Sequence, residues 1–417
     1  RQVGRFARVW PIEWERKRPD ARMIYILIDI LLNRFYEYKI FSVLAVFDQV
    51  QFRALLAAGL SYFIVVFFGK RVIRFLVSMK IGDAGETDAE LLREHAASKA
   101  NVPTMGGILI VGAIFISTFL LADIRVNRVY LGLFTLLWMA GVGGADDWLK
   151  LTASRRGTGR QGLFSWEKLV FQLGIGAIVG YFGYRYGVTP DGAESLAHVL
   201  NLPFQRTYDP QSGLANSALL YLGMPIFVIF STLVVAGISN AVNITDGMDG
   251  LAAGSSAIVS FGLILLALIA GTQSAAQYLL VPYVPFTDEL AVMAGAMAGA
   301  CLGFLWWNCK PAQVFMGDTG SLALGGCIGY IAVMTRQEFV VLLMCGVFLM
   351  EIGSVMLQVG WFKYTRIKTG TGRRIFRIAP YHHHLHQGGW AENQVVVRLW
   401  LIAILFSVVA LATLKLR

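Results

Sequence analysis

Residues 251–271 read LAAGSSAIVSFGLILLALIAG, a run of 21 residues without a charged side chain. The hydrocarbon core of a bilayer is about 30 Å thick, and a helix needs about 20 mostly apolar residues to cross it. The run therefore predicts a membrane-spanning helix. Immediately before it, NAVNITDGMDG (240–250) places two asparagines and two aspartates among glycines: Asn240, Asn243, Asp246 and Asp249. Such a polar cluster beside a span indicates a functional site.

The composition of the whole chain is typical of a membrane protein. Of its 417 residues, 56% are hydrophobic and 15% are charged, and the mean hydropathy is +0.60. Soluble domains are usually about 45–50% apolar. The net charge of +10 would suggest a nucleic acid partner in a soluble protein. No nucleic-acid-binding motif accompanies it, and basic cytoplasmic loops explain the charge in a membrane protein.

Ten segments are long and apolar enough to be predicted as spans. The predicted fold class is therefore an all-α polytopic membrane protein with ten transmembrane helices. Glycines inside several of them allow close helix contacts and are compatible with a homodimer. The segments are 53–69, 105–122, 129–145, 169–187, 217–238, 251–271, 289–307, 319–335, 339–361 and 395–414.

The distribution of basic residues predicts which loops lie in the cytoplasm. The loops after the odd-numbered spans contain 18 Lys and Arg residues, whereas those after the even-numbered spans contain five, counting Arg185 near the end of the fourth segment. Because cytoplasmic loops carry the excess of basic residues, the odd loops are predicted to be cytoplasmic and both termini to lie outside.

The remaining segments offer less information. Residues 1–22 form a basic extension without the apolar core of a signal peptide, and residues 23–417 are predicted to form one integral membrane domain. Residues 23–47 predict an interfacial helix, and 188–216 an external loop. The cysteines are predicted to be packing residues, because their spacing fits neither a disulfide framework nor a zinc site; they are Cys301, Cys309, Cys327 and Cys345.

Every dense polar cluster falls in a predicted cytoplasmic loop. The clusters occupy residues 144–150, 239–250, 306–321 and 374–387. If these loops converge, they form one site rich in carboxylates and histidines at the cytoplasmic membrane surface.

The carboxylates in these clusters are candidate metal ligands. Asp146 and Asp147 adjoin the end of the third predicted span, where charges are costly and usually functional. Asp318 precedes the eighth predicted span, so a helix N-cap is an alternative role for it. Mg²⁺ prefers hard oxygen ligands and commonly combines one or two carboxylates with substrate phosphates. Together, Asp146, Asp147 and Asp318 predict a magnesium site.

Basic residues complement the acids. Lys150 lies four residues after Asp146, a spacing that suits either an ion pair within one helix or a phosphate clamp. The run His382, His383, His384 and His386 resembles a metal-binding tract, but Arg373, Arg374 and Arg377 just upstream favour a phosphate-binding loop. Acids for a metal, basic groups for phosphates and an apolar surround together predict phosphoryl transfer to a lipid.

Five motifs, in order, resemble those of the phospho-N-acetylmuramoyl-pentapeptide transferase family, within the superfamily of polyprenyl-phosphate N-acetylhexosamine-1-phosphate transferases. The resemblance covers the chain from about Met23 to its C-terminus. The motifs are PTMGG (103–107), DDWLK (146–150), SNAVNITDGMDGLA (239–252), FMGDTGSL (315–322) and RRIFRIAPYHHH (373–384).

The resemblance implies a reaction and a place in the cell. The family transfers phospho-MurNAc-pentapeptide from UDP-MurNAc-pentapeptide to undecaprenyl phosphate, giving lipid I and UMP, with Mg²⁺. This implies a multi-pass protein of the bacterial cytoplasmic (inner) membrane, active in peptidoglycan biosynthesis, cell wall biogenesis, cell shape and cell division. Both termini would then be periplasmic, with the active site on the cytoplasmic side.

The resemblance also implies roles for individual residues. Asp146, Asp147, Asp318 and His382 match catalytic positions, and the three aspartates match the metal-associated ones. Matches to substrate-binding positions are Lys150, Lys168, Asn240, Asn243, Asp246, Asp249, Asn308, Phe315, His383 and His384. The chain departs from the family at His386, where the family usually has Glu, and at Asn101–Val102, before PTMGG.

Several alternatives stay open on sequence alone. We expect a single displacement, in which the lipid phosphate attacks the donor directly and Asp146 deprotonates or orients that phosphate. A double displacement through a phospho-aspartate is the alternative. A related transferase that uses UDP-GlcNAc would share the acidic motifs. A transporter would need ionisable residues within its spans, and Glu351 is the main acid predicted to lie deep in a helix.

Overall fold

The computed structural model describes residues 46–79, 102–153, 162–188, 195–210 and 212–416. Within these ranges the protein is helical, with two isolated β-bridges, Val199–Tyr221 and Tyr208–Ala215, and no β-strand. The predictions for residues 1–22 and for nearly all of the interfacial segment 23–47 lie outside the described residues.

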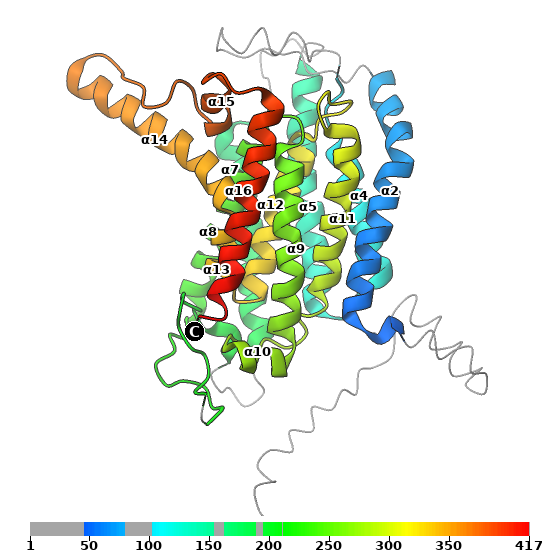
Figure 1. Ribbon diagram of the computed structural model, residues 1–417, viewed down its shortest axis with the longest axis vertical. Helices are drawn as coiled ribbons and strands as arrows, with labels where there is room; N and C mark the ends of the chain where they lie inside the picture. The colour runs from blue at the N-terminus through cyan, green and yellow to red at the C-terminus, as the bar shows by residue number, and fades with distance from the viewer. Residues whose placement is uncertain (1–45, 80–101, 154–161, 189–194, 211, 417) are drawn as a thin grey trace, which may run out of the picture.

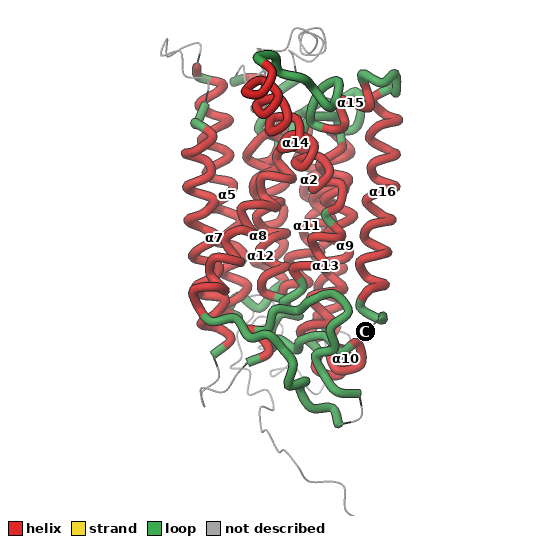
Figure 2. The backbone as a smooth tube through the Cα atoms, turned by 90° about the vertical axis from the view of Figure 1, so that its left-hand side faces the viewer, coloured by secondary structure: helices red, strands yellow, loops and turns green. Residues whose placement is uncertain are grey.

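A helix lies in each of the ten apolar segments, although α8 begins at Met224, seven residues after the start of the fifth segment. The helices run up and down in one bundle, except that α14 leans out of it (Figures 1 and 2). The ninth segment forms two helices, α13 and α14, that meet at a 78° bend. The helices are α2 (Val50–Ser78), α4 (Gly107–Leu121), α5 (Asn127–Leu151), α7 (Ser165–Gly187), α8 (Met224–Thr245), α9 (Leu251–Gly271), α11 (Leu290–Asn308), α12 (Gly317–Met334), α13 (Glu338–Met344), α14 (Gly346–Thr369) and α16 (Glu392–Thr413), with the shorter η2 (Leu196–His198), α10 (Gln273–Leu279) and α15 (Tyr381–His386).

Six of the described helices are long and apolar enough to cross a membrane, or seven if α13 and α14 count as one span. The six are α2, α5, α8, α9, α11 and α16. The protein is therefore a multi-pass membrane protein, while a full set of ten spans stays a prediction. With 15 residues, α4 is shorter than these six helices.

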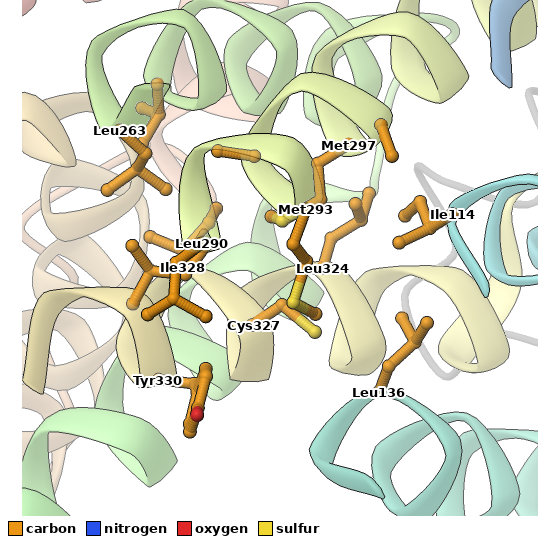
Figure 3. Close-up of a cluster of buried hydrophobic side chains, with 14 of the residues drawn as sticks. Ile114, Leu136, Leu263, Leu290, Met293, Met297, Leu324, Cys327, Ile328 and Tyr330 are labelled. Carbon is orange, nitrogen blue, oxygen red and sulfur yellow. The ribbon is translucent and has the colours of Figure 1, made fainter. Parts of the chain in front are cut away.

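Helix α12 lies at the centre of the bundle. Every residue from Thr319 to Met334 is buried. Because a helix that is apolar all round must be surrounded by other helices, α12 sets the positions of its neighbours. Figure 3 shows its side chains opposite those of α11 in a fully buried cluster that includes Leu290, Met293, Met297, Leu324, Cys327 and Ile328.

Glycines bring α4 and α5 into backbone contact with the start of α12. A Cβ atom at Gly143 of α5 would lie 2.1 Å from the carbonyl oxygen of Asp318, and one at Gly107 of α4 would lie 2.2 Å from the nitrogen of Gly320. Close backbone approach is how small residues hold helices together where burial from water gives no driving force. The start of α12 is thus fixed against two helices.

The opposite end of the bundle is held by buried ion pairs. Arg53 of α2 donates to both carboxylate oxygens of Glu289 at 2.7 Å and to the carbonyl of Leu121, which joins three helix ends. Arg336, after α12, pairs with Glu338 and donates to the carbonyl of Val199. The second contact anchors the predicted external loop onto the turn between α12 and α13.

Replacement of Gly143 with alanine should separate α5 from α12. We expect Gly143→Ala to destabilise the protein by about 1–3 kcal/mol, the usual cost of inserting an atom into a packed interface. Gly141→Ala is the matched control, because a Cβ there meets nothing within 4 Å. It should be neutral or stabilising by up to about 1 kcal/mol, since alanine favours a helix over glycine. Thermal unfolding in detergent compares the two, and equal effects would contradict the interpretation.

Candidate active site

The polar clusters of the sequence gather at one end of the bundle. Helices α5, α8 and α11 end there, and α7, α9 and α12 begin there, beside α15 (Figure 1). Side chains from the first three clusters are in direct contact, as the following distances show, and His382 of the fourth lies against Gly247. The expected convergence into one site is therefore present in the fold.

Three carboxylates form the centre of this site. Ligand oxygens of Asp146, Asp147 and Asp318 all lie within 4.8 Å of one another. The side chains of Asp146 and Asp147 are buried, and that of Asp318 is 14% exposed. Hard oxygen donors at this separation are suited to a divalent cation such as Mg²⁺. Helix α5 continues through Leu151, so the aspartate pair lies inside a helix rather than just beyond one.

Two lysines bridge the carboxylates. Lys150 Nζ lies 2.7 Å from Asp146 Oδ2 and 3.4 Å from Asp318 Oδ2. Lys168 Nζ lies 3.2 Å and 2.9 Å from the same two oxygens. The ion pair between Lys150 and Asp146 within one helix, one of the two roles considered for Lys150, is present. Both ammonium groups also reach a second helix, which a simple surface pair would not do.

Asp147 caps a neighbouring helix. Its carboxylate accepts the backbone N–H groups of Asp318 (3.1 Å) and Thr319 (2.9 Å), and the Thr319 hydroxyl (2.6 Å). The first N–H groups of a helix lack partners within it, and negative charge is favourable there. The alternative N-cap role of Asp318 is ruled out, because Met316 occupies that position without a side-chain cap. Asp147 satisfies these donors instead.

The asparagines of the third cluster lie on a helix. The predicted loop begins at Ser239, but α8 continues to Thr245 because Asn240 and Asn243, one turn apart, both find polar partners. Asn243 Nδ2 donates to Asp318 Oδ1 (3.0 Å) and to the Ser321 hydroxyl (2.9 Å). Asn240 donates to Gln172 of α7 at 2.7 Å, deeper in the bundle. Asn243 therefore joins the carboxylate site, and Asn240 supports it.

Asp246 lies at the rim of the carboxylate site, directly after α8. Its side chain is half-buried. Loss of solvation, followed by the negative charges of Asp318 and Asp147, raises the pKa of Asp246 to about 7. A cation or a substrate proton bound nearby would relieve this repulsion.

Asp249 and Asn308 belong to a separate structure that we name the corner, made of residues 246–250 and 308–314. Asp249 Oδ2 accepts the Ala312 N–H (3.2 Å), and Asn308 Oδ1 accepts the Gly250 N–H (2.9 Å). Asn308 Nδ2 donates to the Val314 carbonyl at 2.8 Å. These bonds tie the two segments together beside the carboxylate site.

Phe315 connects the PTMGG motif to the corner through its backbone. Its N–H donates to the Pro103 carbonyl (2.9 Å), and its carbonyl accepts the Gly106 N–H (2.8 Å). The next pair, from the Gly107 N–H to the Met316 carbonyl, measures 2.8 Å. The motif thus serves to hold the start of α12.

The histidines divide between two environments. His382 is fully buried, and its Nδ1 lies 3.0 Å from Glu351 Oε2. Its Nε2 faces the corner, because a Cβ at Gly247 would lie 2.4 Å from that atom. His383 contacts the His382 ring, with centroids 4.2 Å apart. His384 accepts the Arg377 N–H at 3.2 Å, within its own loop.

Several residues of the site escaped the sequence analysis. Thr319 and Ser321 follow Asp318 within one turn, so their proximity to it could have been inferred from helical spacing. Gln172 and Glu392 gave no signal, because both lie outside the polar clusters of the sequence. His386, which departs from the family pattern, binds the Trp390 carbonyl through Nδ1 (2.8 Å).

Loss of the Asp147 charge should weaken the fold as well as the site. Asp147→Asn leaves two backbone donors and a hydroxyl facing an amide, so we expect a loss of about 2 kcal/mol in the free energy of unfolding. Asp146→Asn removes a charge whose partners are mostly lysines. It should lower the free energy of unfolding by less, because the lysines can turn to solvent. Thermal melting in detergent measures both, and a smaller loss for Asp147→Asn would contradict the capping role.

The combination of an apolar helical bundle with an acidic, lysine-bridged site at one end agrees with the comparisons with known proteins. Residues 129–336 match the model of glycosyl transferase family 4, a class of transferases. The relatives named phospho-N-acetylmuramoyl-pentapeptide-transferase include those of Desulfotalea psychrophila, 40% identical over 89% of this chain and 95% of the relative, and Chloroherpeton thalassium, 41% identical over 90% and 95%. That of Chlorobium chlorochromatii is 42% identical over 90% of this chain and 96% of the relative. The chain belongs to the phospho-N-acetylmuramoyl-pentapeptide-transferase family.

Proposed function

We propose that the protein transfers phospho-MurNAc-pentapeptide from UDP-MurNAc-pentapeptide to undecaprenyl phosphate, forming lipid I and UMP. Membership of the family supports this reaction in peptidoglycan synthesis. The observation that carries the proposal for this chain is the convergence of three carboxylates and two lysines at the end of an apolar bundle. Such a site suits phosphates on both a nucleotide and a lipid.

Mg²⁺ is the proposed cofactor, and Asp318, with Asp146 and Asp147, would hold it. The donor set fits, because all three acids can offer an oxygen within the same 4.8 Å. Of the three, Asp318 is the most exposed and so the best placed to share the ion with a substrate. When bound, the ion neutralises charge on the donor diphosphate.

The lysines are proposed to exchange partners during the reaction. Lys150 and Lys168 each contact Asp146 and Asp318, and Lys150 is 46% exposed. Substrate phosphates offer a denser negative charge than these carboxylates and draw the ammonium groups toward the donor. The exchange lowers the repulsion between two anionic reactants. It also frees Asp146 Oδ2.

The reaction is proposed as a single displacement. An oxygen of the lipid phosphate attacks the phosphorus that carries the sugar. The new P–O bond forms as the bond to the UMP oxygen breaks, and UMP leaves with the electron pair. Asp146, once released by the lysines, orients the attacking phosphate or accepts its proton. The hydrogen bonds that already engage Asp147 and Asp318 support this route over a phospho-aspartate.

The remaining polar residues are proposed to bind the donor. Asp246, Asp249 and Asn308 of the corner, with Phe315 directly after it, would hold the nucleoside. His382 and its neighbours His383 and His384 would contact the phosphates. Asn240 and Asn243 keep α8 in register with the carboxylates. The buried pair between His382 and Glu351 supports a fixed imidazole orientation at this site.

The proposed membrane arrangement has ten spans, periplasmic termini and a cytoplasmic active site in the bacterial inner membrane. The excess of basic residues in the loops at the active-site end supports it. UDP-linked donors are made in the cytoplasm, whereas the lipid acceptor lies in the bilayer, so a site at this surface reaches both.

Loss of any carboxylate should abolish Mg²⁺-dependent transfer. We expect Asp146→Asn, Asp147→Asn and Asp318→Asn to lower kcat by at least about 100-fold, the scale of losing a charged catalytic group. Formation of lipid I from UDP-MurNAc-pentapeptide in detergent, with and without Mg²⁺, measures this. Activity that survives all three changes would refute the site, and equal turnover of UDP-GlcNAc would favour the related class of transferases.

Cys309 reports the sidedness of the site. Among the four cysteines it is the exposed one, and it lies directly after α11 at the active-site end. A membrane-impermeant maleimide should label it in inverted vesicles but not in intact spheroplasts, and Cys309→Ser should abolish the signal. Labelling in intact spheroplasts would overturn the proposed orientation.

A further inference from the structure

Glu392 is a buried acid outside the carboxylate site. It is the first residue of α16 and is 3% exposed. Its Oε2 accepts the ammonium group of Lys310, and its Oε1 accepts the Asp249 N–H at 3.5 Å. One side chain from the last helix therefore reaches both segments of the corner.

The corner has its own internal bonds, but these join only its two segments. The bonds from Ala312 to Asp249 and from Gly250 to Asn308 leave the corner's position relative to α16 undetermined. Apolar contacts press the two together, because Met248 and Leu251 share a buried cluster with Val395, Val396 and Leu399. Hydrophobic contact is non-directional and does not fix a register. The carboxylate of Glu392 supplies directional contacts.

Lys310 pairs with the buried carboxylate of Glu392. Burial of an unpaired carboxylate is costly, whereas a paired one forms short, strong hydrogen bonds. Lys310 is 45% exposed, so its own position is not imposed by the core. The pair holds the segment 308–314 against the start of α16.

We propose that Glu392 is a positioning residue for the donor nucleotide. It fixes the position of the corner, and so of Asp249 and Asn308, relative to the start of α16. This inference rests on the proposed function, in which the corner binds UDP-MurNAc-pentapeptide. Glu392 does not contact the three carboxylates of the site or the two lysines that bridge them, Lys150 and Lys168. It should therefore act on donor binding and leave the chemical step and the lipid acceptor unaffected.

Glu392→Gln tests the proposal with little change in volume. The glutamine NH₂ group then faces a second donor, either the Lys310 ammonium or the Asp249 N–H. The hydrogen bond to that donor is lost. We expect KM for UDP-MurNAc-pentapeptide to rise about 10-fold, as for one misplaced charged hydrogen bond. We expect kcat and the KM for undecaprenyl phosphate to stay within about twofold, since those interactions are remote.

Two further variants separate the contacts. Lys310→Met removes only the ion pair at an exposed position and should raise the donor KM by less than Glu392→Gln does. The double variant should be no worse than Glu392→Gln alone, because both changes remove one shared interaction. Glu392→Asp keeps the charge and should recover part of the donor affinity.

Gln394→Ala is the matched control for damage to α16. Gln394 caps the start of the same helix by accepting the Ala391 N–H at 3.2 Å. Its loss should lower the melting temperature without raising the donor KM. If Glu392 had a purely structural role, Glu392→Gln would likewise lower the melting temperature without raising the donor KM.

The outcomes are distinguishable. A wild-type protein that does not use the UDP donor would sink the proposed function itself. With an active wild type, the inference is overturned if Glu392→Gln leaves the donor KM unchanged, raises both KM values in parallel, or lowers only kcat. If Glu392→Gln does not fold, an unchanged donor KM in both Lys310→Met and Glu392→Asp overturns it instead.

Discussion

The carboxylate of Asp147 at the start of α12 is the contact on which the site depends. Helix α12 is buried along its whole length after Thr319, so its first N–H groups cannot be satisfied by water and need a protein partner. Asp147 provides it from α5, and Gly143, one turn earlier, allows the backbones to touch. The same junction presents Asp318 to Asp146 and to both lysines. Helix packing and catalytic geometry are therefore one arrangement.

The charges in the site are balanced by partners that can be exchanged. Two lysines facing the acids keep buried carboxylates paired, which an apolar surround requires. At the rim of the site, loss of solvation and then the negative charges of Asp318 and Asp147 raise the pKa of Asp246, which shows the cost of acids that lack cationic partners. In the proposed reaction, the same lysines would leave the carboxylates for the substrate phosphates, with which ammonium groups form charge-assisted hydrogen bonds.

Much of this arrangement could be predicted from the sequence. Span-length apolar runs gave the helices, and the placement of every polar cluster in alternate loops indicated that they meet. Helix ends were harder, since Asn240 and Asn243 read as a loop but are held in a helix by Gln172 and Asp318. Asp318 was considered as an alternative cap for α12, and Asp147 was not, because local spacing cannot reveal a partner that arrives from another helix. Glu392 was missed for the same reason.

The route of the chain through the corner has a consequence for biosynthesis. The carboxylate site uses residues up to Ser321 and can assemble when α12 has entered the bundle. The corner is complete only when Glu392 arrives, more than seventy residues later in the chain. Since translation proceeds from the N-terminus, a nascent chain would assemble its acidic centre before the proposed nucleotide site at the corner. Under the proposed function, incomplete chains in the membrane would therefore not bind the donor.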